Sequence, residues 1–225
     1  MPHALEQIYS FLQVQNYTAE VLVVENGSSD RTYEIALELS KQYIDLRVLR
    51  EEQPGKGNAI RRGMLKARGE YRFMCDTDLS MPIEELVKFT PANATQLDIA
   101  IGSREASGAV RYDEPVYRHL GGRLINLAIR MLILPGLQDT QCGFKCFRAD
   151  VAEDIFPYQI IPSWAFDIEI LYIARKRGYQ ITEVPIHWYF DPETKLRAIK
   201  DAILMLRDIF LIHLNNLRGL YDPQD

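Results

Sequence analysis

Over the first hundred positions, short apolar runs alternate with stretches in which apolar residues recur at helical spacing. Short apolar runs bounded by turn residues predict buried strands at residues 20–24, 46–49, 71–75 and 97–102. Between these runs the apolar residues recur at helical spacing, as Ile35, Leu39 and Tyr43 do, and they predict helices at residues 4–12, 30–43, 57–68 and from Pro82 onward. Strands that alternate with helices form a mostly parallel sheet with helices on both faces. The pattern therefore predicts an α/β fold of the doubly wound type.

The second half of the chain is more helical. Its pattern predicts helices at residues 117–134, 164–176 and 195–217, and a strand at residues 181–188. The first of these helices is basic and amphipathic and is weakened by Gly121 and Gly122. Pro185 cannot donate a backbone hydrogen bond, so we expect the strand at a sheet edge. In the last helix the residues expected to face inward are Ile199, Ile203, Leu206, Ile209 and Phe210.

Composition and charge narrow the class of protein. The chain has 225 residues, of which 47% are hydrophobic and 25% are charged, so it is expected to fold as a single domain over residues 1–225. Its formal net charge of −5 argues against a general nucleic-acid binder. The three cysteines are an odd number with no second Cys pair, which favours a reducing compartment over a disulfide framework or a cysteine metal site.

The sequence carries no recognisable targeting or spanning segment. Its start lacks a charged region followed by a long apolar one, so we do not expect secretion. No run of about eighteen apolar residues occurs, so no transmembrane helix is expected. These features predict a cytoplasmic protein that is at most peripheral on a membrane.

Two carboxylates follow the predicted strand at residues 71–75. The stretch Asp76-Thr77-Asp78 stands at the carboxyl end of that strand, where parallel sheets bind ligands. Like charges this close repel each other and favour a cation between them, and carboxylate oxygens suit Mg²⁺ or Mn²⁺ that bridges to a diphosphate. The alternative is a solvated turn in which an aspartate caps the next helix, because this short pattern is common in proteins.

A glycine-rich stretch precedes the third predicted helix. Gly55-Lys56-Gly57 leads into the helix, and Arg61 and Arg62 follow within it. Backbone amides at a helix start and nearby cationic side chains attract phosphate. The spacing is not that of a P-loop. The alternative for the two arginines is a solvated helix face.

Five stretches in this order resemble family-2 glycosyltransferases of the GT-A fold. They read VVENGSSDRT, GKGNAIRRGM, DTDLS, GSR and DTQCGFKCF, and the last, with WAFDIEIL and EVPIHW after it, is most similar to the dolichyl-phosphate β-glucosyltransferase branch. The resemblance covers nearly the whole chain from residue 21 onward. It implies a nucleotide-binding half at about residues 1–104 and an acceptor-side half at about residues 105–225.

The resemblance also implies roles for individual residues. Glu25 and Asn26 stand where the family commonly has two aspartates at the nucleoside base. The nucleotide would be bound by Glu25, Asn26, Gly27, Lys56 and Asp76. The metal, Mg²⁺ or Mn²⁺, would be held by Asp76 and Asp78 with Ser80 near it. The acceptor side would be formed by Arg104, Gln141, Gly143 and Phe144.

The implied reaction is an inverting transfer of a hexose from a nucleotide sugar, UDP-glucose or GDP-mannose, to a polyprenyl phosphate. A phosphate monoester is mostly dianionic at neutral pH and is already nucleophilic, so a strong general base is not required. A sugar hydroxyl as acceptor would need a positioned carboxylate. Asp139 and Asp167 are the candidates for that catalytic role, and helix capping is the alternative for Asp167.

Five arginines cluster in one region of this acidic chain, between residues 104 and 130. Leu120, Leu124, Leu127 and Met131 share the predicted helix at residues 117–134 with several arginines, which predicts a membrane-surface helix or an ordinary core-facing helix with solvated arginines. The arginines of this region are Arg104, Arg111, Arg118, Arg123 and Arg130.

The chain departs from the family pattern at its start. The family begins with a central strand and its loop, whereas this sequence begins with a stretch similar to the helix after that loop. We therefore expect either a gap in the sheet or direct pairing of residues 21–24 with residues 72–75. Two rival functions stay open: a nucleotide-sugar-binding protein whose catalysis is impaired by the lost strand, and a nucleotidyltransferase.

Overall fold

The computed structural model describes residues 1–90, 97–190 and 198–223, with side chains described for all of these except 117, 118, 120 and 198–202. Strands and helices alternate through the first seventy residues as the pattern predicts. The elements are α1 (Pro2–Leu12), β1 (Val21–Asn26), α2 (Thr32–Ser40), β2 (Leu46–Glu51) and α3 (Lys56–Lys66). The second helix is shorter than predicted, because the chain turns after Ser40 instead of continuing to Tyr43.

A four-stranded sheet forms the centre of the molecule. Its strands, in the order β3-β6-β4-β7, are β3 (Tyr71–Met74), β6 (Lys145–Arg148), β4 (Ile99–Ser103) and β7 (Ile181–Pro185). The edge position of β7 confirms the expectation drawn from Pro185. Strand β6 was not predicted, and it runs antiparallel to both β3 and β4. The sheet is therefore mixed at its centre, while the β4–β7 and β1–β2 pairs are parallel.

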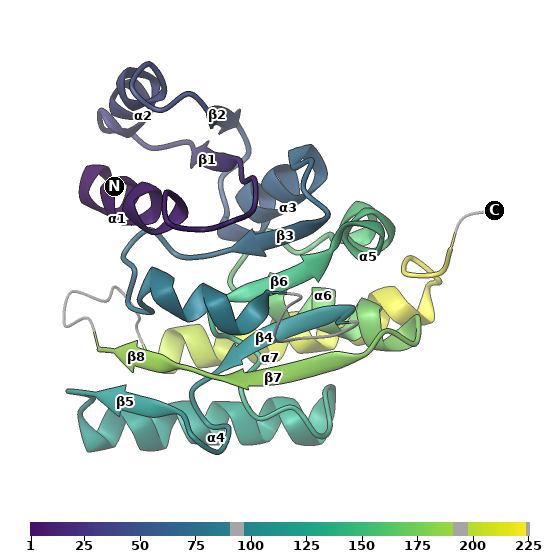
Figure 1. Ribbon diagram of the computed structural model, residues 1–225. Helices are drawn as coiled ribbons and strands as arrows, with labels where there is room; N and C mark the ends of the chain where they lie inside the picture. Colours follow the sequence, from purple (N-terminus) through teal and green to yellow (C-terminus); the bar gives the residue numbers. More distant parts are fainter. Residues whose placement is uncertain (91–96, 191–197, 224–225) are drawn as a thin grey trace.

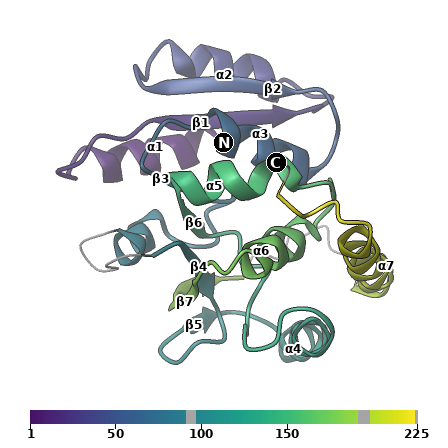
Figure 2. The ribbon, with the colours of Figure 1, turned by 90° about the vertical axis from the view of Figure 1, so that its right-hand side faces the viewer.

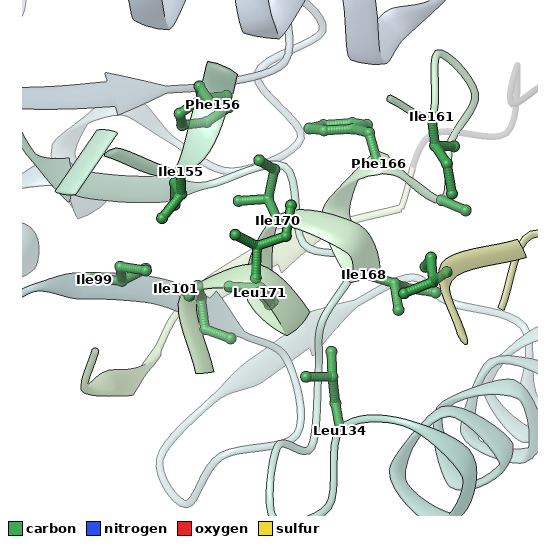
Figure 3. Close-up of a cluster of buried hydrophobic side chains, with 14 of the residues drawn as sticks. Ile99, Ile101, Leu134, Ile155, Phe156, Ile161, Phe166, Ile168, Ile170 and Leu171 are labelled. Atoms are coloured by element: carbon green, nitrogen blue, oxygen red, sulfur yellow. The ribbon is translucent and has the colours of Figure 1, made fainter. Parts of the chain in front are cut away.

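The central sheet is covered by apolar side chains on both faces. Ile99 and Ile101 of β4 belong to the larger core cluster, whereas Ala100 between them belongs to a second cluster with Phe144. Alternate residues of a strand point to opposite faces, so β4 is buried on both sides. The larger cluster is built with α5 (Ala149–Ile155), the short helix η2 (Phe156–Tyr158) and α6 (Phe166–Lys176) (Figure 3). The smaller one includes Phe89 of η1 (Ile83–Phe89).

The expected gap in the sheet is present. Among the described residues β1 pairs with β2 alone, and β3 pairs with β6 alone, so β1 and β3 are not hydrogen-bonded to each other. Figure 1 shows the strands in the succession β2, β1, β3, β6, β4 and β7 down the molecule. Helix α3 connects the two parts, because it packs on β1 and β2 and also on α5 and α6.

Strand β5 (Val110–Tyr112) and helix α4 (Val116–Leu132) lie at the end of the molecule opposite α2 (Figures 1 and 2). Strand β8 (His187–Tyr189) pairs in parallel with β5, and α7 (Ala198–Leu217) packs on both α4 and α6. The predicted strand at residues 181–188 is thus divided at Ile186 between two sheets.

The prediction of which residues of the last helix face inward is mostly wrong. Ile209 is buried as expected, but Ile203, Leu206 and Phe210 are 63%, 52% and 67% exposed. The side chain of Ile199, the remaining prediction for this face, is not described, and the predicted helix start at residue 195 lies outside the described residues. Because α7 packs along one narrow side on α4 and α6, its other apolar side chains are left facing outward. Within the described ranges no helix is long and apolar enough to cross a membrane.

Candidate functional site

The end of β3 and the start of α3 bring a lysine and an aspartate together. Asp76 follows β3, Lys56 is the first residue of α3, and Lys56 Nζ lies 2.6 Å from Asp76 Oδ1. Burial alone would lower the pKa of Lys56, but the charges of Asp76, Asp167 and Asp78 raise it overall, so the lysine is a cation. A fixed cation and a carboxylate therefore share the end of a sheet strand, where α/β folds bind ligands.

Gly143 is packed directly against the Asp76 carboxylate. A Cβ atom built on Gly143 would lie 2.1 Å from Asp76 Oδ2 and 2.6 Å from its Cγ. Real Cβ atoms do not approach other atoms this closely, so no larger residue fits without moving Asp76. The resemblance implies an acceptor-side role for Gly143, and the structure places it against the carboxylate to which the resemblance assigns a nucleotide-binding role.

Asp78 and Ser80 form the outer end of the same turn. Asp78 is exposed, and its Oδ1 accepts a hydrogen bond of 3.0 Å from the Ser80 amide. Leu79 between them has a φ of 50°, a left-handed conformation that costs roughly 1–2 kcal/mol for a residue with a Cβ. This strained turn therefore holds Asp78 at the surface, two residues after Asp76.

Asp76 and Asp78 suit a magnesium or manganese ion whose coordination shell is completed by other ligands. Among the side chains that the structure describes, no third Asp, Glu, His or Cys joins Asp76 and Asp78 in a metal-binding group. A hard cation such as Mg²⁺ is commonly held by one or two carboxylates, with water and substrate phosphate completing its shell. The pair thus suits an ion that arrives with a diphosphate rather than one in an all-protein cage.

Asp167 lies in a buried ion pair. Lys145 Nζ is 2.5 Å from Asp167 Oδ1, and the two side chains are 1% and 3% exposed. Burial raises the pKa of Asp167, while the charges of Lys145 and Lys56 oppose that rise. Lys145 also donates to the Cys142 carbonyl at 2.5 Å, so one cation ties α6 to β6 and to the loop before it. Because Lys145 pairs with the Asp167 carboxylate, the geometry favours a positioning role for Asp167 over a role in proton transfer.

Asp139 is held by Arg104 through two side-chain contacts. Arg104 Nε donates to Asp139 Oδ2 at 2.7 Å, and Arg104 Nη2 donates to Oδ1 at 2.9 Å. The Asp139 side chain is fully buried. Burial opposes its ionisation, but the Arg104 guanidinium overcomes this and holds the pKa of Asp139 at about 2. Bidentate arginine–carboxylate pairs are directional as well as strong, so this pair fixes the loop that leads to Gly143.

Asn26 connects the end of β1 to the turn before α3. Its Nδ2 donates to the Gln53 carbonyl at 2.7 Å, and its Oδ1 accepts from the Gly55 amide at 2.7 Å. The neighbouring Glu25 is buried, accepts a hydrogen bond from the Ser28 amide and lies 3.5 Å from Arg50 Nε. An aspartate at position 26 has no donor for Gln53, so the amide has a structural reason to stand here. Gly27 follows with a φ of 61°, which glycine adopts without strain.

The other residues implied on the acceptor side are mainly enclosed. Phe144 is fully buried and its ring packs edge-on against Phe73 at 4.8 Å between centroids. The Gln141 amide donates to Asp139 Oδ1 at 3.3 Å. Phe144 therefore has packing contacts where the resemblance implies acceptor contacts, and Gln141 belongs to the loop that Asp139 organises.

Both arginines in α3 already have partners. Arg61 donates to the carbonyls of Phe156 and Pro157, each at 3.1 Å, and Arg62 lies 3.6 Å from Glu51. Arg61 therefore fixes η2 against α3. Arg61 makes neither the phosphate contact nor the solvated helix face that the sequence predicted.

Two residues at the site were not predicted. Lys145 is one, and its signal was a charge inside the apolar run GFKCF, which is typical of a buried ion pair. Trp164 is the other: it is 55% exposed, and its ring lies 4.9 Å from Lys56 Nζ. A cation over an aromatic ring is stabilised by the negative ring face. The pattern at residue 164 indicated only a helix start, so nothing in it pointed to Lys56.

A comparison with known protein families identifies a family model that matches more than half of the chain. The model described as "Glycosyl transferase family 2" matches residues 3–156. Curated relatives named dolichyl-phosphate beta-glucosyltransferase are 30% identical in Saccharomyces cerevisiae, 32% in Dictyostelium discoideum and 30% in Homo sapiens. The alignments cover 90%, 98% and 98% of this chain, and 66%, 72% and 73% of the three relatives.

Solved structures with the same fold are more distant in sequence. The glucosyl-3-phosphoglycerate synthase of Mycobacterium tuberculosis is 18% identical, with a TM-score of 0.62 over 99% of this chain and 76% of that one. A second structure of that enzyme, with Mn²⁺, UDP-glucose and phosphoglyceric acid, has a TM-score of 0.61 and 18% identity over 99% of this chain and 75% of that one. At this identity the likeness shows the GT-A fold alone.

Proposed function

From the premise that the chain belongs to glycosyl transferase family 2, we propose that it transfers glucose from UDP-glucose to a polyprenyl phosphate such as dolichyl phosphate. The observation that carries the proposal is the meeting of Lys56 and Asp76 beside Gly143, with Asp78 at the rim of the same turn. The names of the curated relatives support glucose and dolichyl phosphate as the two substrates.

The donor side needs a positive environment for the diphosphate. Lys56 supplies a fixed cation and holds Asp76, while Asp78 stays exposed at the rim. Asp76 and Asp78, with Ser80 beside them, would hold Mg²⁺ or Mn²⁺. When bound, such an ion neutralises charge that develops on the leaving diphosphate. The Mn²⁺ and UDP-glucose in the mycobacterial enzyme support this pairing of ion and donor.

The acceptor attacks the anomeric carbon while the sugar–phosphate bond breaks, which inverts the configuration. A phosphate monoester is mostly dianionic near neutral pH, so no proton has to be removed from it. This agrees with the state of Asp139 and Asp167, which are buried and paired with Arg104 and Lys145. We assign both carboxylates to positioning the loop that contains Gly143 and the start of α6, rather than to base catalysis.

The acceptor's charge is matched by α4. A cleft of about 310 Å³ is lined by Arg123 and Arg130 together with Leu124 and Leu127, and also by Glu105, whose charge Arg111 balances. Neither arginine has a carboxylate partner among the described residues, whereas Arg111 pairs with Glu105 and Glu114. Cations beside apolar side chains suit a lipid phosphate and an anionic membrane surface. Both α4 and α7, which pack against each other, also carry exposed apolar residues.

Removing the cations of α4 is expected to weaken membrane binding. Each basic residue near an anionic surface contributes about 1 kcal/mol, so R123A/R130A should bind vesicles containing anionic lipid roughly tenfold or more weakly. Co-sedimentation at low salt measures this, and added salt should release the wild type. R31A, which removes a cation in the distant α2 region, is the control. Equal binding of wild type and R123A/R130A would contradict the membrane assignment.

Turnover with a defined acceptor tests the function. The purified chain is incubated with UDP-glucose, a polyprenyl phosphate and Mn²⁺, and the glucosylated lipid phosphate is quantified. D76N removes a charge that pairs with Lys56 and would help to hold the metal, so transfer should fall by about 100-fold or more. D150N, at an exposed carboxylate away from the site, should keep the wild-type rate.

Three other results would replace the proposal. UDP-glucose binding without transfer to any acceptor favours the binding-protein alternative, which the gap between β1 and β3 supports. Transfer to a sugar hydroxyl but not to a lipid phosphate returns a base role to Asp139 or Asp167. Formation of a nucleotide sugar from a sugar phosphate and a nucleoside triphosphate favours a nucleotidyltransferase.

A further inference from the structure

The loop at residues 159–164 is packed against the start of α3 through backbone contacts. The Gly57 amide donates to the Pro162 carbonyl at 2.9 Å, and Gln159 Nε2 donates to the Gly57 carbonyl at 2.8 Å. A Cβ on Gly55 would lie 2.4 Å from Pro162 O, and one on Gly57 would lie 2.5 Å from Ile161 O. The two segments are in direct contact through backbone groups and the Gln159 side-chain amide, so the position of the loop sets the position of Lys56 between the two glycines.

Glu169 in α6 holds this loop from its other side. Its Oε2 accepts from the amides of Ile160 and Ile161 at 3.0 and 2.8 Å. Its Oε1 accepts from the Tyr221 hydroxyl at 2.6 Å. Both side chains are fully buried. The carboxylate therefore uses both oxygens to connect the loop to the segment that follows α7.

We propose that Glu169 and Tyr221 are a positioning pair: they hold the loop at residues 159–164 against the start of α3 and thereby place Lys56 and Trp164 for donor binding. The proposal rests on the proposed function, since it takes Lys56 as part of the donor site. Neither residue contacts Lys56 itself, so both act through the loop.

The charge of Glu169 matters to this arrangement. The ionised carboxylate accepts all three donors, whereas a protonated one must use one oxygen to carry a proton and loses or reverses a contact. The groups that face it are the Tyr221 hydroxyl, with Asn215 donating to that hydroxyl at 3.3 Å, and the negative charge of Asp208, which Arg207 partly balances. Burial raises the pKa of Glu169 to about 7, and the hydrogen bonds from Tyr221 and the two amides oppose the rise.

Donor affinity should therefore depend on pH through Glu169. We expect the affinity of the wild type for UDP-glucose with Mn²⁺ to rise as the pH increases from about 6 to about 8, because the ionised form holds the loop best. UDP-glucose is the probe because its diphosphate carries no monoester that titrates in this range. Titration calorimetry at several pH values measures the affinity.

Two variants separate this role from a general effect on stability. E169Q keeps an acceptor for the amides and a polar group for Tyr221 but cannot ionise, so its affinity should be independent of pH in that range. Y221F removes one hydrogen bond and should weaken binding by about two- to tenfold. Y179F removes a similar bond, from Tyr179 to Asp154 at 2.9 Å, away from the loop, and should leave affinity unchanged.

The outcomes are distinguishable. A wild type that binds UDP-glucose, with E169Q and Y221F indistinguishable from it at every pH, overturns the positioning pair alone. A wild type that binds no UDP-glucose at any pH overturns both the pair and the proposed function. An unchanged pH profile in E169Q with weaker binding in Y221F also overturns the role of the carboxylate's charge.

Discussion

Replacing Arg104 with alanine is expected to lower the free energy of unfolding by about 3–5 kcal/mol, because it leaves a fully buried carboxylate without its cation. Asp139 would keep only backbone donors such as the Gln141 amide at 3.3 Å. Urea unfolding of wild type and R104A measures the difference. R31A is the matched control, since Arg31 pairs with Glu34 on the surface, where solvent screens the attraction and the pair contributes little to stability.

A second substitution identifies the cause. In R104A/D139N the buried charge is gone, so the double variant should be more stable than R104A although it carries one more change. A loss in R104A of the size seen in R31A would contradict the buried ion pair. Equal stability of R104A and R104A/D139N would mean that lost packing, not an unpaired charge, is the cause.

The same pair predicts a response to acid. The pKa of Asp139 is about 2 in the folded chain against an ordinary value of 3.8, so its ionised form is stabilised by folding. That contribution is fully present above the ordinary pKa and is lost as the pH falls from 3.8 towards 2. R104A should therefore lose less stability than wild type over this range.

Replacing Gly143 with alanine is expected to reduce transfer by about 100-fold without removing any chemical group, because a displacement of about 1 Å at a reacting centre has effects of that size. The new Cβ would lie only 2.1 Å from Asp76 Oδ2, so the carboxylate that Lys56 contacts must shift from its position. Transfer rates at saturating UDP-glucose, with the melting temperature measured in parallel, test this.

The control is another glycine of the same chain. Gly122 lies in α4, and a Cβ there would meet no atom within 4 Å. Alanine in a helix is favoured over glycine by up to about 1 kcal/mol, so G122A should be equally or slightly more stable and fully active. A G143A variant with the wild-type rate would mean that Asp76 tolerates displacement and is not held in a reactive position.

The local sequence patterns predicted most elements of the fold because strands and helices have different apolar periods. They did not predict β6, since a four-residue strand that contains Lys145 carries no clear alternation. The prediction of the buried face of α7 was wrong for a different reason. Helical spacing shows that Ile203, Leu206 and Phe210 share a face, but only the packing of α4 and α6 decides whether that face is covered.

Some features of the candidate site could likewise be predicted from the local sequence, and others could not. The turn at Asp76 and Asp78 could be predicted because it follows a strand end, and Lys56 because it opens a helix. The partners of Asp139 and Asp167 could not, since Arg104 is 35 residues and Lys145 is 22 residues from its carboxylate and no local spacing relates them. Asn26 was assigned to the base by resemblance alone, whereas its contacts with Gln53 and Gly55 depend on how β1 meets the turn before α3.

The open edges of β1 and β3 bear on how the molecule unfolds. In a continuous sheet the backbone hydrogen bonds between neighbouring strands make distant parts melt together. Here α2, β1 and β2 are coupled to the rest chiefly through the packing of α3, so they form a region that can open at lower free energy than the central sheet. Glu25 and Asn26 belong to that region, whereas Asp76 follows β3 of the central sheet. A nucleotide sugar that contacts both would therefore join two cooperative units into one, and part of its binding energy would be spent on ordering the protein.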